Sequence, residues 1–315
     1  MMKKPAVIIA GPTAVGKTKL SIEIAKSLDG EIVSADSMQI YRYMDIGTAK
    51  PSLSERQGIP HHMIDILDPE QEFSVAEYQK MALSIIDDIH RRNKLPIIVG
   101  GTGLYIKSLL YPMNFTDAYQ DVEYRKKLQD MAEKKGKDYL HQKLKEIDPI
   151  TAARLHPNDV KRVIRALEVY YLSGKPMSHY VQNLKDMDFR YNVAMIGLTM
   201  DRAKLYERIN RRVDAMIEAG LLDEVKDLLD RGYTRNMISM QGLGYKEIID
   251  YYQGKLSLEE AVQILKRETR RYAKRQLTWF RAQKGIKWIN MDEFNSEEEL
   301  VDYAISCIKK KLNFI

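Results

Sequence analysis

The sequence has 315 residues, of which 44% are hydrophobic, and its 50 Lys and Arg against 44 Asp and Glu give a net charge of +6. This length and composition are typical of a folded protein with one large core or two modest ones, and they exclude a disordered tail. No apolar run approaches the roughly 20 residues of a membrane-spanning helix, no signal-peptide core precedes the first predicted strand, and a single cysteine excludes an internal disulfide, so we expect a cytoplasmic protein without membrane contact.

Residues 1–113 alternate between short apolar runs and a helical pattern. The runs at 6–10, 31–35 and 95–99 predict buried strands, and 75–92 predicts a helix before the last of them. Such alternation is typical of a parallel sheet with helices on both faces.

The pattern changes after residue 113. Helices are predicted at 121–134, 138–146, 149–155 and 159–173, with no convincing strand among them. A strand pattern returns at 192–198, and a long helix is predicted at 202–219. We therefore predict an α/β core made of 1–113 and 192–315, with C-terminal helices, interrupted by an all-helical insertion at 114–191.

The most informative motif directly follows the first predicted strand and matches G-x-x-x-x-G-K-[ST] at every fixed position. Its residues are Gly11, Pro12, Thr13, Ala14, Val15, Gly16, Lys17 and Thr18. Between a strand and a helix, such a loop points backbone N–H groups at phosphate oxygens, and the helix N-terminus adds a favourable dipole. Lys17 adds a positive charge, and Thr18 can hold Mg²⁺. The motif predicts a di- or triphosphate ligand on a P-loop NTPase-like core with a mostly parallel sheet.

Two polar segments follow the second and third predicted strands, at the sheet edge where ligands of open α/β folds bind. Asp36 comes directly after 31–35, beside hydrogen-bonding Ser37 and Gln39, and Thr102 lies in a glycine-rich stretch after 95–99. Asp36 is either a metal ligand or a proton acceptor. We expect both segments and the P-loop to converge on one pocket.

Residues 266–281 predict a basic helix without Gly or Pro. Seven of them are Lys or Arg and one, Glu268, is acidic. Uncharged residues recur on one stripe of this helix at steps of three and four residues: Val262, Leu265, Thr269, Tyr272, Gln276 and Trp279. The cations therefore lie on the other faces. The helix predicts contact with phosphates or nucleic acid, and a solvated charged face is the alternative.

Six motifs in this order resemble the signature set of the bacterial tRNA dimethylallyltransferases, also called tRNA isopentenyltransferases. They are the P-loop and the segments 36–41, 100–105, 165–170, 244–247 and 278–281, so the resemblance covers nearly the whole chain. It implies transfer of a dimethylallyl group from dimethylallyl diphosphate to N6 of the adenosine 3′-adjacent to the anticodon, in tRNAs that read codons beginning with U. Diphosphate is released and ATP is not consumed. The P-loop would then hold the donor diphosphate and stabilise the charge that grows as the C–O bond breaks.

The resemblance also implies roles for individual residues. Asp36 is expected to take the proton of the adenine amine, with Thr102 near that amine, while Arg212 and Arg208 bind the diphosphate. The target base is expected to be extruded from the anticodon loop into the site. Asp36 and Thr102 are expected to contact this loop, together with residues of five segments: Ser37, Met38, Gln39, Arg125, Lys161, Arg162, Arg165, Gln241, Gly242, Leu243, Gly244, Tyr245, Lys246, Arg271 and Lys274.

Three tyrosines have further expected roles. Residues 241–246 are expected to form a flexible loop, in which Tyr245 either stacks on RNA or packs in the core. Tyr170 and Tyr171 depart mildly from the family pattern, and we expect them to affect packing and not chemistry. The expected assembly is a monomer that binds Mg²⁺, dimethylallyl diphosphate and a tRNA anticodon stem-loop, with the insertion closing over the RNA as a lid.

Three other functions are alternatives. A P-loop small-molecule kinase, or a prenyltransferase acting on free AMP, would not need so broad a cationic surface. A nucleotide-gated RNA-binding switch would need a guanine-reading Asn-Lys-x-Asp segment, and residues 93–96 end in Pro96 instead. The zinc finger of eukaryotic relatives is not expected, because Cys307 is the one cysteine.

Overall fold

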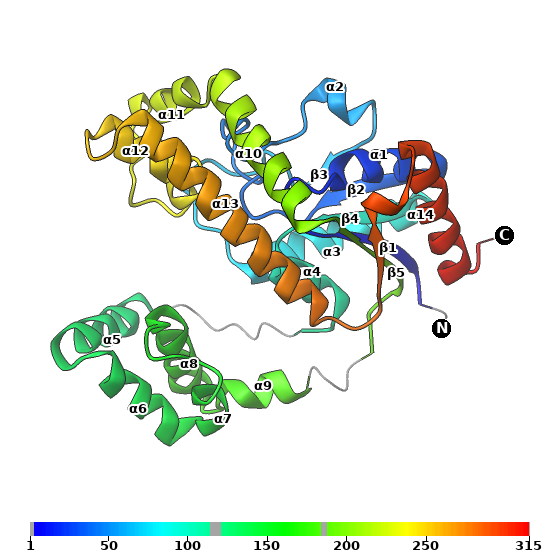
Figure 1. Cartoon of the computed structure of the whole chain (residues 1–315). Coiled ribbons are helices and arrows are strands. Elements are labelled where there is room, and N and C mark those ends of the chain that lie inside the picture. The colour runs from blue at the N-terminus through cyan, green and yellow to red at the C-terminus, as the bar shows by residue number, and fades with distance from the viewer. Residues whose placement is uncertain (1–2, 114–120, 184–187, 315) are drawn as a thin grey trace. The chain divides into compact units, whose positions relative to one another are not determined.

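The computed structural model describes residues 3–113, 121–183 and 188–314 (Figure 1). The chain divides into two compact units: a core unit, Met1–Leu110 with Phe189–Ile315, and a helical unit, Tyr111–Asp188. The helical unit begins and ends three residues before the predicted insertion.

The core unit is built on a six-stranded, wholly parallel sheet with the strand order β3-β2-β4-β1-β5-β6. The strands are β1 (Pro5–Ala10), β2 (Gly30–Ser34), β3 (His61–His62), β4 (Leu95–Gly100), β5 (Asn192–Thr199) and β6 (Ile286–Asn290). The four predicted strands are confirmed as β1, β2, β4 and β5. The two edge strands were not predicted, because β3 has only two residues and β6 is only partly buried.

Helices surround this sheet. They are α1 (Lys17–Ser27), α2 (Leu53–Arg56), α3 (Val75–Arg91), α4 (Gly103–Leu110), α10 (Arg202–Glu218), α11 (Leu221–Asp230), α12 (Tyr245–Tyr252), α13 (Leu258–Arg281) and α14 (Glu297–Leu312), with short 3₁₀ turns η1 (Ser239–Gln241) and η2 (Met291–Glu293). Helices α1 and α14 pack together against one face of the sheet, whereas α3 and α4 pack together against β4 (Figure 1). The predicted P-loop NTPase-like α/β core is confirmed.

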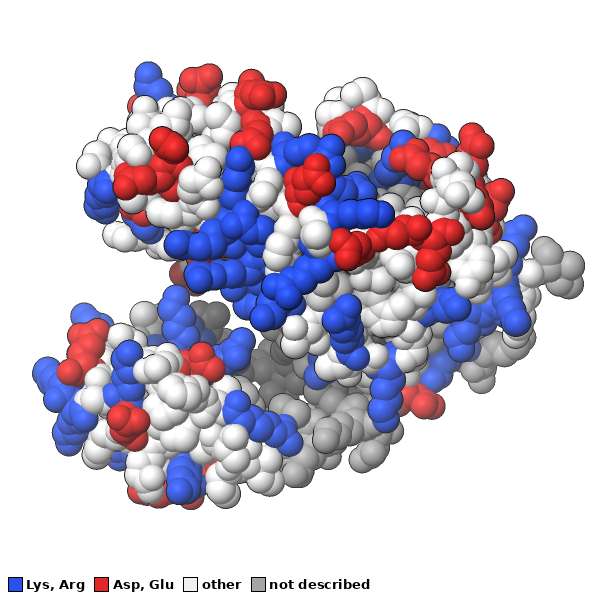
Figure 2. Space-filling view, viewed as in Figure 1, with Lys and Arg blue, Asp and Glu red and all other residues white. Residues whose placement is uncertain are grey.

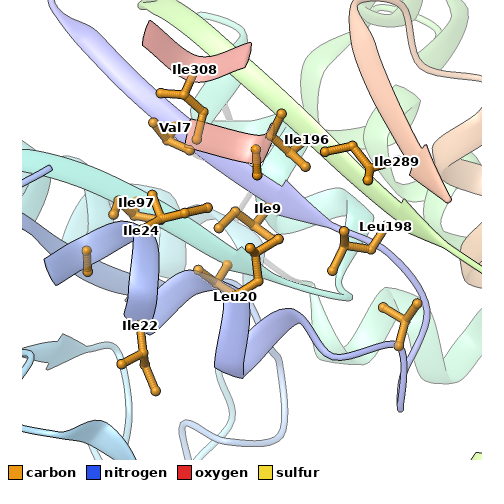
Figure 3. Close-up of a cluster of buried hydrophobic side chains, with 14 of the residues drawn as sticks. Val7, Ile9, Leu20, Ile22, Ile24, Ile97, Ile196, Leu198, Ile289 and Ile308 are labelled. Atoms are coloured by element: carbon orange, nitrogen blue, oxygen red, sulfur yellow. The ribbon is translucent and has the colours of Figure 1, made fainter. Parts of the chain in front are cut away.

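The main core fills the space between the sheet and the pair α1 and α14 (Figure 3). Val7 and Ile9 of β1 meet Leu20 of α1 and Ile308 of α14 there, and all four are at most 3% exposed. Ile8, which alternates with them, is also buried, because successive strand residues point to opposite faces of a sheet that is covered on both sides. This explains why β1 reads as a continuous apolar run.

A second core lies among α10, α11, α12 and α13. These helices enclose Met44 and Tyr41 from the loop after β2, together with Val213, Tyr245 and Leu265. This packing fixes one face of α10 and α13 toward the loops at the carboxyl edge of the sheet, and it leaves their opposite faces to solvent.

The helical unit contains α5 (Val122–Lys135), α6 (Lys137–Ile147), α7 (Pro149–Ala152), α8 (Val160–Ser173) and α9 (Met177–Asn183). Its core includes Leu128, Leu140, Leu144 and Leu167. The buried carboxylate of Asp148 accepts hydrogen bonds from Thr151 N at 2.9 Å and from Ser178 N at 2.8 Å, so it joins the starts of α7 and α9. The predicted helices are confirmed here, with no strand in 121–183. Across the described parts of both units, no helix combines the length and apolar character needed to cross a membrane.

Candidate active site

The P-loop connects β1 to α1. Gly16 caps α1 in a left-handed conformation, with φ of 104°. A Cβ atom at Gly16 would lie 3.2 Å from Met291 Cε, so both the backbone and its surroundings favour glycine. Lys17 Nζ donates to Pro12 O at 2.7 Å, which folds the lysine back over the loop. The loop and its lysine thus form the arrangement that binds phosphate in P-loop proteins.

The charge on Lys17 depends on two neighbours. Burial lowers the pKa of Lys17 to about 8, the Asp36 carboxylate opposes this effect, and the Arg212 guanidinium lowers the pKa further. The three side chains therefore share one electrostatic environment, although they come from the P-loop, the loop after β2, and α10.

Asp36 and Thr102 lie on two adjacent loops that are hydrogen-bonded to each other. Asp36 Oδ1 accepts from Met38 N at 2.9 Å and from Gln39 N at 3.4 Å. Thr102 Oγ1 accepts from Ser37 N at 3.1 Å and donates to Ser37 Oγ at 3.3 Å. No hydrogen bond within the described residues uses Asp36 Oδ2, so this oxygen can accept a proton from a ligand.

Gln276 of α13 joins the P-loop to the loop after β4. Its Oε1 accepts from Thr13 N at 2.9 Å, and its Nε2 donates to Gly101 O at 3.0 Å. A Cβ atom at Gly101 would lie 2.1 Å from Gln276 Nε2, so a side chain there would displace the amide. Burial raises the pKa of Tyr272, one turn earlier on α13, while side-chain hydrogen bonds with Gln276 and Thr102 oppose that rise. The inner face of α13 therefore contacts both the phosphate loop and the Thr102 loop.

The predicted diphosphate ligands of α10 lie beside the P-loop. Arg208 Nη2 would be 3.8 Å from a Cβ atom at Gly16. Burial lowers the pKa of Arg212, the nearby carboxylates of Asp36 and Glu55 oppose this, and Arg208 lowers it further. Arg212 also lines a cavity of about 730 Å³ beside the loop after β2, whose lining includes neither the P-loop nor Asp36. The geometry brings both guanidiniums, one helical turn apart, to the site of Lys17 and Asp36.

The exposed faces of α10 and α13 carry many cations, which Figure 2 shows as blue side chains gathered where these helices lie in Figure 1. Several of these cations are engaged. Lys266 pairs with Asp214, Arg270 donates to Asn210 Oδ1 at 2.6 Å, and Arg271 donates to Glu268 at 2.7 Å. Lys274 is exposed and forms no ion pair with any of the described residues. The predicted basic helix is confirmed, and its cations differ in how freely they can reach a phosphate.

The segment 241–246 differs from its prediction as a flexible loop. Gln241 ends η1 and Tyr245 begins α12, because Glu247 caps the helix by accepting from Gly244 N at 2.9 Å. Gly242 and Leu243 are half-buried, and Lys246 pairs with Glu247 at 3.6 Å.

Tyr245 is fully buried, and its hydroxyl donates to Glu224 Oε1 at 2.7 Å. The predicted stacking of Tyr245 on RNA is therefore wrong, and its packing in the core is the correct alternative. Gly244 is also buried, so the exposed residue of this segment is Gln241.

In the helical unit, two of the four predicted RNA-binding cations share one buried carboxylate. Glu168 accepts from Arg125 Nε at 2.8 Å and from Arg165 Nη1 at 2.6 Å. Lys161 is exposed, and Arg162 lies 3.7 Å from Asp159. Arg125 thus joins α5 to α8, whereas Arg165 pairs with Glu168 within α8, in addition to any role at an RNA surface.

The site offers few protein ligands for a metal ion. No cluster of three His, Cys, Asp or Glu side chains suited to a metal occurs among residues 3–113, 121–183 and 188–314. Thr18 is exposed in the first turn of α1, and its hydroxyl forms no hydrogen bond in those ranges. This donor set fits Mg²⁺, which binds through one or two protein oxygens with substrate phosphates and water as its other ligands.

Residues Gln276 and Tyr272 were missed as part of the site. Both lie on the uncharged stripe that the sequence predicts for the basic helix. A polar amide at an inward position was the available signal, since a buried amide requires hydrogen-bond partners.

Comparisons with known proteins agree with this geometry. The family model described as IPP transferase matches residues 39–283. Curated proteins named tRNA dimethylallyltransferase are 58% identical in Acetivibrio thermocellus, over 94% of both chains, and 56% identical in Alkaliphilus oremlandii, over 99% of both.

Two solved structures are also similar. The tRNA isopentenylpyrophosphate transferase of Bacillus halodurans superposes with a TM-score of 0.73 and 48% identity, over 99% of this chain and 98% of that one. A eukaryotic dimethylallyltransferase acting on tRNA superposes with a TM-score of 0.82 and 33% identity, over 96% of this chain and 78% of that one.

Proposed function

The chain belongs to the IPP transferase family, an enzyme family that transfers a dimethylallyl group to tRNA, and we propose that the polar carboxyl edge of its sheet carries that reaction. The observation that supports this most directly is the double hydrogen bond of Gln276. It holds the P-loop, which suits a diphosphate, next to the loop of Thr102, which is itself bonded to the Asp36 loop. A phosphate site and a proton acceptor therefore lie on loops that hydrogen bonds join to one another.

The donor in this proposal is dimethylallyl diphosphate, bound by the backbone amides of the P-loop and by Lys17, Arg208 and Arg212. The C–O bond to the diphosphate breaks, and negative charge grows on the leaving oxygen. Two guanidiniums and an ammonium beside the loop stabilise that charge more in the transition state than in the bound substrate. When Mg²⁺ is bound, held by Thr18, it adds positive charge at the same phosphates.

The acceptor is N6 of the adenosine 3′-adjacent to the anticodon, in tRNAs that read codons beginning with U. The amine is a poor nucleophile because its lone pair is delocalised into the purine ring, and it must lose a proton as the N6–C bond forms so that the product is neutral. Asp36 Oδ2 takes this proton, and the Thr102 hydroxyl, which is hydrogen-bonded to the Asp36 loop through Ser37, orients the amine. The products are prenylated adenosine, diphosphate and a protonated Asp36, so atoms and charge balance.

The tRNA is held through its backbone. Exposed cations of α13, Arg271 and Lys274, and of the helical unit, Lys161 and Arg162, suit phosphates of the tRNA backbone. Every residue of this proposal comes from one chain, so a monomer suffices, and a cytoplasmic location follows from the location of tRNA.

Label transfer from radioactive dimethylallyl diphosphate distinguishes the candidate functions. The protein is incubated with the donor and either unmodified tRNA, free AMP or no acceptor, and a parallel reaction offers labelled ATP. Label in tRNA alone is the expected result. Label in AMP would support the small-molecule prenyltransferase instead, and phosphate transfer from ATP would support a kinase.

A further inference from the structure

A stacked aromatic pair with one exposed ring joins α5 and α8 of the helical unit, outside the six motifs that carry the family resemblance. The ring of Tyr171 on α8 stacks on the ring of Tyr124 on α5, with centroids 4.0 Å apart and planes inclined by 10°. Tyr171 is 58% exposed and is not part of the core of Leu128, Leu140 and their neighbours. Tyr124 is packed at the edge of that core. A large ring surface of Tyr171 is therefore held in place and left open to solvent.

Two positioned guanidiniums lie on the same two helices as this pair. Glu168, one helical turn before Tyr171, is fully buried and binds both Arg125 and Arg165. Their side chains are still 35% and 37% exposed. Because the buried carboxylate already fixes both arginines, they lose little side-chain freedom when they contact a phosphate.

The charge of the unit indicates the chemistry of its occupant. Residues 121–183 include 13 Lys and Arg against 9 Asp and Glu, so the unit attracts polyanions. A planar ring open on one side, with cations fixed beside it, is typical of proteins that bind unpaired nucleotides, whose bases stack on aromatics while Arg and Lys hold their phosphates.

We propose that Tyr171, supported by Tyr124, is a stacking platform for an unpaired nucleobase of the anticodon loop, with the flanking phosphate at Arg125 and Arg165. This inference rests on the proposed function, because it takes tRNA as the substrate. It assigns Tyr171 a specificity for single-stranded RNA that the packing role expected from the sequence does not include.

The test uses the full-length protein with Tyr171→Leu, which keeps an apolar cover on Tyr124 but removes the ring. Stacking of one base contributes about 1–3 kcal/mol, so the Kd for a tRNA anticodon stem-loop should rise about tenfold. Tyr171→Trp should restore binding. The matched control is Tyr139→Leu, which removes a partly exposed tyrosine from α6 of the same unit and should leave Kd within twofold.

Two further measurements separate stacking from damage to the unit. The slope of log Kd against log salt should be the same in Tyr171→Leu as in the wild type, because no charge is removed. Fluorescence of 2-aminopurine at one unpaired loop position should be quenched by the wild type and less so by the variant. An altered slope would show displaced arginines, and would overturn the proposal.

The proposal also fails if Tyr171→Leu binds the stem-loop as tightly as the wild type, or if the variant changes only the oligomeric state. Either result would assign the ring to packing or to a protein contact. Wild-type protein that binds RNA but transfers no label to tRNA would contradict the proposed function instead, so the two failures are distinguishable.

Discussion

Gln276 Oε1 accepts a hydrogen bond from Thr13 N at 2.9 Å, although the two residues are 263 positions apart in the chain. The same amide donates to Gly101 O. The helix that presents cations on its outer face thus fixes, on its inner face, one N–H of the phosphate loop and the loop that carries Thr102. Because a buried amide without hydrogen-bond partners is costly, this contact should hold the two loops in fixed positions relative to each other.

Replacing Gln276 with Met should therefore impair donor use. The variant leaves Thr13 N–H and Gly101 C=O without partners, at a cost of about 1–3 kcal/mol. We expect KM for dimethylallyl diphosphate to rise about tenfold while the Kd for tRNA stays within twofold. Gln263→Met, at an exposed position of α13, is the control and should change neither value. A loss confined to tRNA binding would show that Gln276 contacts RNA and does not position the P-loop.

Substitution of Asp36 by Asn tests the proton acceptor. The Asn oxygen can still accept from Met38 N and Gln39 N, so the loop should keep its conformation, but the amide cannot take a proton. We expect the single-turnover rate to fall about 10²-fold or more, with tRNA affinity within a few-fold of the wild type. Near-normal turnover would remove Asp36 from the proton transfer.

The lowered pKa of Lys17 predicts a pH dependence of donor binding. In the free protein, Lys17 loses its proton near pH 8, and only the ammonium form attracts diphosphate. The Kd for inorganic diphosphate should rise above about pH 8, by up to tenfold per pH unit. Lys17→Arg should abolish this dependence, because a guanidinium stays charged in the same range. A Kd that is flat from pH 7 to 10 in the wild type would contradict the assignment.

The pH dependence of stability has the opposite sign to that of diphosphate affinity. The unfolded chain keeps the Lys17 proton up to about pH 10.5, whereas the folded protein loses it near 8, so the unfolded state binds more protons between these values. The contribution of Lys17 to the free energy of unfolding therefore rises with pH across this window. Unfolding of the wild type should show this rise relative to Lys17→Met, as donor affinity falls.

The sequence predicts the local parts of this site well. The P-loop, β1 and α1 follow from residues adjacent in the chain, where strand pattern, glycines and helical spacing agree. The exposed position of the cations on α13 is also predictable from the sequence, because the stripe that includes Leu265 defines which side of the helix faces the core.

The partners of those residues could not be predicted. That Gln276 meets Thr13, or that Glu168 holds both Arg125 and Arg165, depends on how distant elements pack, which periodicity does not specify. The burial of Tyr245 has the same origin. Gly242 and Gly244 suggested a loop, but tertiary packing against Met44 and Leu265 made this segment the start of a buried helix.

Tyr245→Phe tests that correction. The variant removes the hydrogen bond to Glu224, whose carboxylate also accepts from the backbone N–H groups of Asp45, Ile46 and Gly47. We expect the free energy of unfolding to fall by about 1–3 kcal/mol, with unchanged tRNA affinity. Tyr252→Phe, which removes a more exposed hydroxyl from the same helix, should cost less. Weakened tRNA binding at unchanged stability would instead place Tyr245 at the RNA.

Variants of two lysines on the basic helix distinguish a cation that contacts phosphate from one that forms a structural ion pair. Lys274 is exposed and has no carboxylate partner in the described ranges, whereas Lys266 is only 15% exposed and pairs with Asp214. If tRNA binding neutralises about four phosphates, log K should fall with log salt with a slope of about −3. Lys274→Met should flatten this slope by about one unit.

Lys266→Met should leave the salt slope unchanged, because its side chain is only 15% exposed as well as paired with Asp214. Binding of a tRNA anticodon stem-loop, followed by anisotropy from about 50 to 300 mM salt, measures both slopes. The two variants remove the same charge from the same helix, so net charge alone cannot produce a difference between them. Equal slopes in both variants and the wild type, with prenylation intact, would make the outer face of α13 a solvated surface.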